Sequence, residues 1–109
     1  MVDDNLPPDD PIPSELVRED PGFADIVLEF LDGLGARLGE MEDALRQSDF
    51  ERLRVAAHQL KGSGGGYGYP VLTERAAELE TLAKKQALDD CIDAIEQLKS
   101  IASRVIVGD

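Results

Sequence analysis

Apolar side chains recur every three or four residues along most of the chain, the spacing that places them on one face of an α-helix. The first such stripe follows Asp20-Pro21, an acid and a proline that are typical of a helix start. Its members are Ile26, Phe30, Leu34, Leu38, Met41 and Leu45. Gly33, Gly35 and Gly39 fall inside this stretch, and as poor helix formers they predict a local bend or a close helix crossing.

Three further stripes follow the first. The second helix is predicted to start at Ser48-Asp49-Phe50-Glu51, which matches the S-x-x-E capping box, and to end in the glycine run 62–68. Its inner face is Leu53, Ala57, Leu60 and Gly64. A third helix is predicted from about Pro70, with the stripe Leu72, Ala76, Leu79 and Ala83. A fourth is predicted after Lys85-Gln86, with the stripe Leu88, Ile92, Ile95, Leu98, Ala102 and Val105.

These four stripes predict the fold. Short links join them, and the alternation of period two that marks a β-strand is nowhere convincing. We therefore expect an all-α protein, an antiparallel up-down four-helix bundle preceded by a short N-terminal helix at about 14–19. Residues 1–13 alternate prolines with aspartates and are predicted to form a disordered acidic tail, which leaves residues 14–109 as the domain.

Composition narrows the classes of partner. The net charge is −12 over 109 residues, so the chain repels nucleic acid phosphates and anionic lipid. Cys91 is the only cysteine, which excludes an internal disulfide, and with one histidine a zinc site of the usual kind is excluded as well. No apolar run approaches the length of a membrane span. We expect a cytoplasmic protein without a metal site of its own, and a monomer.

The single histidine is predicted to lie outside the core. At 100° per residue, His58 lies far from the centre of the buried stripe of its helix and points towards solvent. An exposed imidazole is largely neutral at pH 7, so one ring nitrogen is free to act as a nucleophile. Lys61, three residues on, is placed to offset negative charge on that ring. Arg54, one turn earlier, either assists or is an ordinary surface charge.

Residues around His58 also predict a docking surface. Gly62 and Gly65 leave the neighbouring surface without side chains, which would permit close approach of a partner's reactive group, although glycines there also suit helix packing or a helix end. Val55 is expected on the outer side of the helix, where it would suit a partner or pack against the N-terminal segment. Gln59, beside His58, completes the predicted docking residues.

The sequence around His58 resembles a known family signature. It reads Ala57-His58-Gln59-Leu60-Lys61-Gly62-Ser63-Gly64-Gly65-Gly66-Tyr67-Gly68. This string resembles the signature of histidine-containing phosphotransfer domains, and the likeness extends over residues 20–107, including Phe30-Leu31 and Ala77-Glu78-Leu79-Glu80. The glycine content of 63–66 exceeds that of the family pattern.

The resemblance implies roles for four residues. His58 would be the phosphoacceptor through Nε2, Lys61 the cation near the phosphoryl oxygens, and Gly62 the small residue that opens the docking surface. Glu80 would orient the imidazole through its other nitrogen, because an acid there fixes the tautomer. A solvated helix face is the other interpretation of Glu80, and the sequence does not decide between the two.

The function implied is that of a phosphoryl carrier. A kinase or a phosphorylated receiver domain would donate to His58, and the aspartate of a receiver would accept. The Mg²⁺ would belong to the receiver. With neither a P-loop nor a G-x-G-x-x-G turn, the chain is not expected to be an enzyme that phosphorylates itself. The alternatives are a stoichiometric adaptor that binds a receiver without being phosphorylated, and a domain excised from a larger hybrid kinase.

Overall fold

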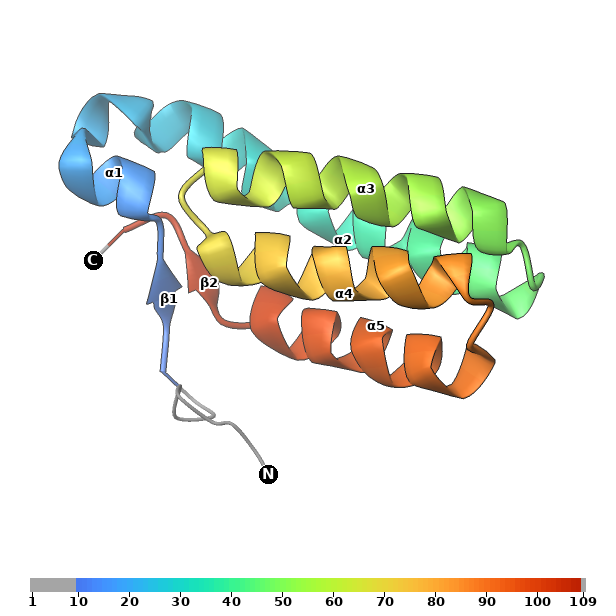
Figure 1. Ribbon diagram of the computed structural model, residues 1–109. Coiled ribbons are helices and arrows are strands. Elements are labelled where there is room, and N and C mark those ends of the chain that lie inside the picture. Colours follow the sequence, from blue (N-terminus) through green and yellow to red (C-terminus); the bar gives the residue numbers. More distant parts are fainter. Residues whose placement is uncertain (1–9, 109) are drawn as a thin grey trace.

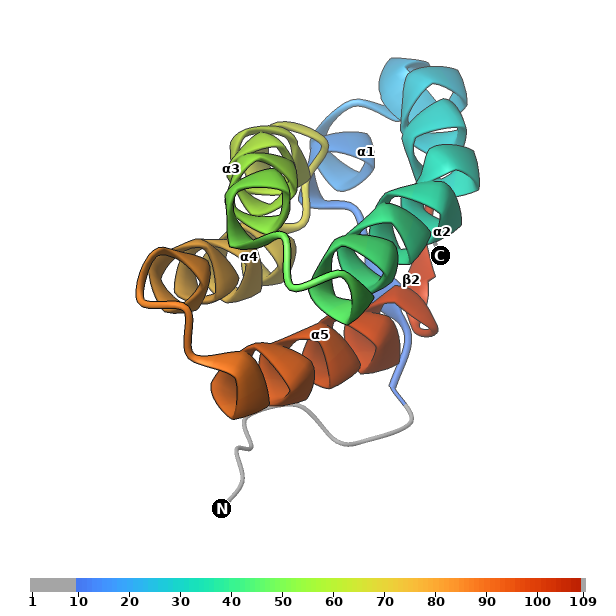
Figure 2. The ribbon, with the colours of Figure 1, turned by 90° about the vertical axis from the view of Figure 1, so that its right-hand side faces the viewer.

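The computed structural model describes residues 10–108. Its helices are α1 (Glu15–Glu19), the 3-10 turn η1 (Pro21–Phe23), α2 (Ala24–Arg46), α3 (Phe50–Gly66), α4 (Pro70–Lys84) and α5 (Leu88–Ala102). The colours of Figure 1 show the chain reversing direction at each link between the four long helices. Figure 2 shows the same helices nearly end-on around a common core, with α3 packed most extensively against α4. The predicted helical bundle with a short N-terminal helix is confirmed.

The core confirms two of the four stripes and corrects the other two. The predicted inner faces of α3 and α4 are all buried. On α2, however, Ile26 is 47% exposed and Val27 is fully buried in its place. On α5, Leu88 and Ile92 are exposed, whereas Cys91 and Ala94 are buried. Both helices carry apolar side chains on two adjoining faces, so spacing alone did not settle which face the neighbouring helices cover.

Two further expectations about the helices are corrected, one at the start of α3 and one inside α2. The N-cap of α3 is Asp49, whose side chain accepts a hydrogen bond from the Arg52 N–H, and not Ser48, which has a φ of 55°. Helix α2 runs unbroken past its three glycines, and a Cβ at Gly33, Gly35 or Gly39 would meet nothing within 4 Å. The prediction of a close helix crossing at these glycines is therefore wrong.

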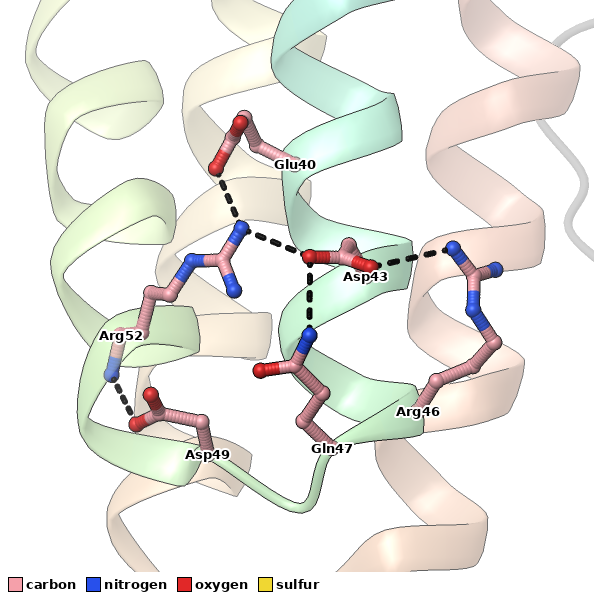
Figure 3. A network of polar contacts seen from close by, with 6 residues as sticks. All are labelled: Glu40, Asp43, Arg46, Gln47, Asp49 and Arg52. Carbon is pink, nitrogen blue, oxygen red and sulfur yellow. Dashed lines mark hydrogen bonds and ion pairs between the residues drawn. The ribbon is translucent and has the colours of Figure 1, made fainter.

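A polar network secures the link between α2 and α3 (Figure 3). The Arg52 guanidinium, on the first turn of α3, donates from Nη2 to Glu40 Oε1 at 2.7 Å and to Asp43 Oδ2 at 3.0 Å, both on α2. Gln47, in the link, donates its amide to the same Asp43 oxygen. Arg52 lowers the pKa of Asp43, chiefly through the hydrogen bond between them. These contacts join the first turn of α3, the helix that carries His58, to α2.

The two ends of the described chain pair with each other at one end of the helical bundle. β1 (Ile12–Pro13) pairs in parallel with β2 (Val105–Ile106), so two residues assigned to the predicted tail are part of the fold. Residues 1–9 of that tail lie outside the described residues. After β1, Ser14 caps α1 and donates from Oγ to the Tyr67 carbonyl at 2.7 Å. The segment thus holds the turn that follows α3.

Candidate functional site

His58 lies on α3 and points outwards, as its position in the helix predicts. Its side chain is 62% exposed, while Ala57 and Leu60 on either side of it face the core. The imidazole is nevertheless held, because Nδ1 lies 3.0 Å from Oε2 of Glu80 on α4. The ring is therefore accessible on one edge and fixed on the other.

Glu80 is buried, which excludes the solvated-face interpretation of this residue. Its side chain is 8% exposed, although it carries a carboxylate. The carboxylate has two close partners from α3: His58 Nδ1 on Oε2, and Lys61 Nζ at 2.8 Å from Oε1. Its pKa is lowered, chiefly by the hydrogen bond from Lys61, against an opposing effect of burial, with His58 lowering it further. Glu80 is thus a carboxylate at neutral pH.

An ionised carboxylate fixes the tautomer of the histidine. A carboxylate without its proton can only accept hydrogen bonds, so Nδ1 of His58 must be the donor in this contact. In the neutral ring the other nitrogen, Nε2, then carries the free lone pair. Because Nδ1 faces the buried acid and the ring is mostly exposed, Nε2 is the nitrogen left to an incoming reactant.

Two lysines lie close to the Glu80 carboxylate. Lys61 is one turn after His58, is about one-third exposed, and contacts the same carboxylate as the imidazole. Lys84, which sequence reasoning missed, lies 3.9 Å from the Glu80 oxygen that also faces His58. The available signal was its spacing, four residues after Glu80, which places the two side chains on the same side of α4. The site therefore combines one exposed imidazole, one buried acid and two partly exposed lysines.

This arrangement agrees with the comparison of the sequence with known families. The sequence profile of the Hpt domain matches residues 25–107. The chain belongs to the Hpt domain family. Hpt domains are phosphocarriers that act in histidine phosphotransfer and two-component signalling, where they interact with receiver domains and kinases. No curated protein and no solved structure matches the chain.

The glycines of this Hpt domain differ in their surroundings. A Cβ at Gly62 would meet nothing within 4 Å, so the surface beside the histidine is open there. Gly64 lies at the closest approach of the helices, where a Cβ would come within 2.8 Å of the Leu72 Cβ. Gly65, predicted as a docking residue, has Thr73 Oγ1 3.0 Å from where its Cβ would be. Of the two glycines predicted to form the docking surface, Gly62 is therefore the one with open surroundings.

Two of the remaining predicted docking residues, Val55 and Gln59, line one groove, and Arg54 does not. Val55 is exposed and, with Gln59, lines a shallow groove between α2 and α3. Arg54 is bound by Glu51 on its own helix, with Nη2 2.6 Å from Oε2, and its pKa is raised chiefly by this contact. Glu80 raises the pKa of Arg54 further, so this charge also acts on the acid that contacts His58.

Metal-binding groups and membrane-spanning helices are both absent from the described residues. Within residues 10–108, His, Cys, Asp and Glu side chains form no group of three or more that could hold a metal ion. None of the helices in this part of the chain has the length and hydrophobicity needed to cross a membrane.

Proposed function

We propose that this Hpt domain carries a phosphoryl group on Nε2 of His58 and passes it between signalling proteins. A sensor kinase or a phosphorylated receiver domain donates the group, and the aspartate of a second receiver accepts it. The contact between His58 Nδ1 and the buried Glu80 supports this proposal most directly, because it leaves Nε2 exposed with a free lone pair.

The transfer step follows from these groups. The Nε2 lone pair attacks the phosphorus of an aspartyl phosphate on a receiver, an N–P bond forms, and the P–O bond to the aspartate breaks. The aspartate leaves as a carboxylate. The imidazole keeps its proton on Nδ1, so the positive charge that develops on the ring faces the Glu80 carboxylate at 3.0 Å. The reverse reaction uses the same atoms.

Lys61 acts on the phosphoryl group itself, and Gly62 acts on how closely the partner protein can reach it. A phosphoryl group adds negative charge to a chain that already carries a net charge of −12. Lys61 offsets that charge locally, since it is three residues from His58 and partly exposed. Gly62 leaves room for the partner's active site to reach phosphorus in line. Val55 and Gln59 extend the docking surface along the groove between α2 and α3.

The proposal also includes the source of the metal ion, the location of the carrier and the extent of its functional unit. Mg²⁺ is supplied by the partner receiver, whose carboxylates bind it beside the phosphoryl oxygens. The carrier has no catalytic turnover of its own and works as a cytoplasmic monomer. Residues 14–109 form the functional unit, with the strand at Ile12–Pro13 attached to it.

Phosphoryl transfer from a panel of radiolabelled, phosphorylated receivers to the wild-type protein and to His58→Gln tests the proposal. Wild type should take up label that is lost in acid and kept in base, as expected of a phosphohistidine, and His58→Gln should take up none. His58→Gln should keep the helical circular dichroism of wild type, because the ring is mostly exposed. Receiver binding without label on any donor would support the stoichiometric adaptor instead.

A further inference from the structure

The end of α3 is unusually rich in glycine for a helix that carries the site. Four of its last five residues are glycine, at positions 62, 64, 65 and 66. Each weakens a helix by about 1 kcal/mol relative to alanine. Lys61 comes directly before this segment, so its position depends on whatever keeps the last turns of α3 in place.

Thr73 of α4 contacts one backbone group within this segment and one directly before it. Its Oγ1 donates to the Lys61 carbonyl at 2.7 Å and accepts from the Gly65 N–H at 2.7 Å. These two groups are four residues apart, and they are the pair that a regular α-helix joins to each other. One hydroxyl therefore bridges a full turn of α3 and ties that turn to the neighbouring helix.

The close packing of α3 on α4 makes this bridge fit. A Cβ at Gly64 would lie 2.8 Å from the Leu72 Cβ and 3.2 Å from the Thr73 N, so only glycine permits this approach. At such a short separation, the one-carbon reach of a threonine hydroxyl is sufficient. The glycines that weaken α3 thus also bring it within reach of Thr73.

Thr73 and Glu80 contact Lys61 from the same helix. They are seven residues apart, which is two turns, and so share one side of α4. Glu80 binds the Lys61 ammonium, and Thr73 binds the Lys61 carbonyl. Together the two residues of α4 hold both the side chain and the backbone of Lys61.

We infer that Thr73 is a positioning residue for the phosphoryl site, which holds the last turns of α3 so that Lys61 stays opposite Glu80 and beside His58. The inference rests on the proposed function for its kinetic consequence only. The geometry that it describes can be measured without any phosphoryl donor.

Thr73→Val keeps the shape of the side chain and removes the hydroxyl. The rate of transfer from a phosphorylated receiver to His58 should fall about tenfold, because small displacements of a charge-stabilising group are costly in phosphoryl transfer. Thr73→Ser retains the hydroxyl and should restore most of the rate. The matched control is Thr81→Val on the exposed side of the same helix, which should transfer at the wild-type rate.

A double-variant experiment separates positioning of Lys61 from general support of the fold. If Thr73 acts through Lys61, adding Thr73→Val to Lys61→Gln should leave the rate of Lys61→Gln almost unchanged. A further tenfold loss in that background, or a wild-type rate for folded Thr73→Val, would overturn the inference. Thr73→Ala takes the place of Thr73→Val if the latter does not fold.

Urea unfolding provides a measurement that needs no phosphoryl group. Lys61→Gln removes the ion pair with Glu80, so it should lower the unfolding midpoint more in the wild-type background than in Thr73→Val. Equal shifts in the two backgrounds would contradict the positioning of Lys61 by Thr73. A wild-type protein that takes no label but shows unequal shifts would remove the proposed function and leave this structural inference standing.

Discussion

Glu80 Oε2 lies 3.0 Å from His58 Nδ1, across 22 residues of sequence and between two helices. The acid is buried and the imidazole is exposed, so the contact holds the ring without covering it. A freely rotating exposed histidine would present both nitrogens and many orientations to a partner. Here one nitrogen is engaged, and the orientation of the other is set.

Removing this anchor should slow phosphoryl transfer while keeping the acceptor. Glu80→Ala deletes a hydrogen bond to a charged group, worth about 1.5–3 kcal/mol, so we expect the transfer rate to fall about tenfold or more. In Glu80→Gln the transfer rate should fall less, because the amide oxygen of the glutamine still accepts a hydrogen bond from Nδ1. Rapid-quench transfer from a phosphorylated receiver measures both. Transfer at the wild-type rate in Glu80→Ala would show that the contact does not orient the ring for reaction.

The same acid makes stability depend on pH. The pKa of Glu80 in the folded protein is lowered from its ordinary value of 4.5, chiefly by Lys61. A carboxyl group with a depressed folded pKa binds protons more tightly when unfolded, so its contribution is full above about pH 4.5 and is lost as the pH falls through the folded value.

Urea unfolding of wild type and Glu80→Gln across pH 7 to 3 checks this dependence. The difference in free energy of unfolding between the two should shrink as the pH drops below 4.5. Asp43 and Glu51 also have lowered pKa values, but they are present in both proteins and cancel in the difference. A difference independent of pH down to 3 would contradict the ion pair.

Gly62→Gln should block transfer without harming the fold. A side chain at this position enters open space, so the free energy of unfolding should stay within about 0.5 kcal/mol of wild type or rise slightly, because glycine is a poor helix former. The added side chain stands beside His58 and should slow transfer about a hundredfold. Gly39→Gln, an equally open helical glycine on α2, is the control and should transfer normally. Equal rates for the two variants would remove the role assigned to Gly62.

Gly68 is the glycine on which the fold itself should depend. Its φ is 97°, and a Cβ there would overlap Ser14 Oγ, where the N-terminal segment crosses the turn after α3. Its carbonyl also accepts from the Glu15 N–H at 2.8 Å. Gly68→Ala should therefore lower the free energy of unfolding by about 2 kcal/mol or more.

A matched substitution tests the reason for this loss. Gly39→Ala lies in a regular helix with open space around it, so it should stabilise the protein by about 0.5–1 kcal/mol. Thermal unfolding of the two variants beside wild type measures both effects. A neutral Gly68→Ala would mean that the N-terminal segment does not pack against the turn after α3.

Local rules were sufficient for the helices and for the outward direction of His58. Helical spacing predicted the buried faces of α3 and α4, because the apolar stripe of each recurs at i, i+4, i+7 and i+11, all on one side of a helix. The H-x-x-K-G spacing brought His58 and Lys61 to the same acid for a similar reason, since residues three and four apart are neighbours on any helix. These features depend on backbone geometry within about two turns.

The remaining features depend on how the helices pack. Ile26 and Val27 are equally apolar, and only the position of the neighbouring helices leaves the first exposed and the second buried. Glu80 belongs to a run of charged and apolar residues like any solvated helix face, and it became a buried partner of His58 because α4 lies against α3. Thr73 carried no signal in the sequence for the same reason. Short-range periodicity determines which residues share a helix face, whereas close packing between distant segments decides which faces meet.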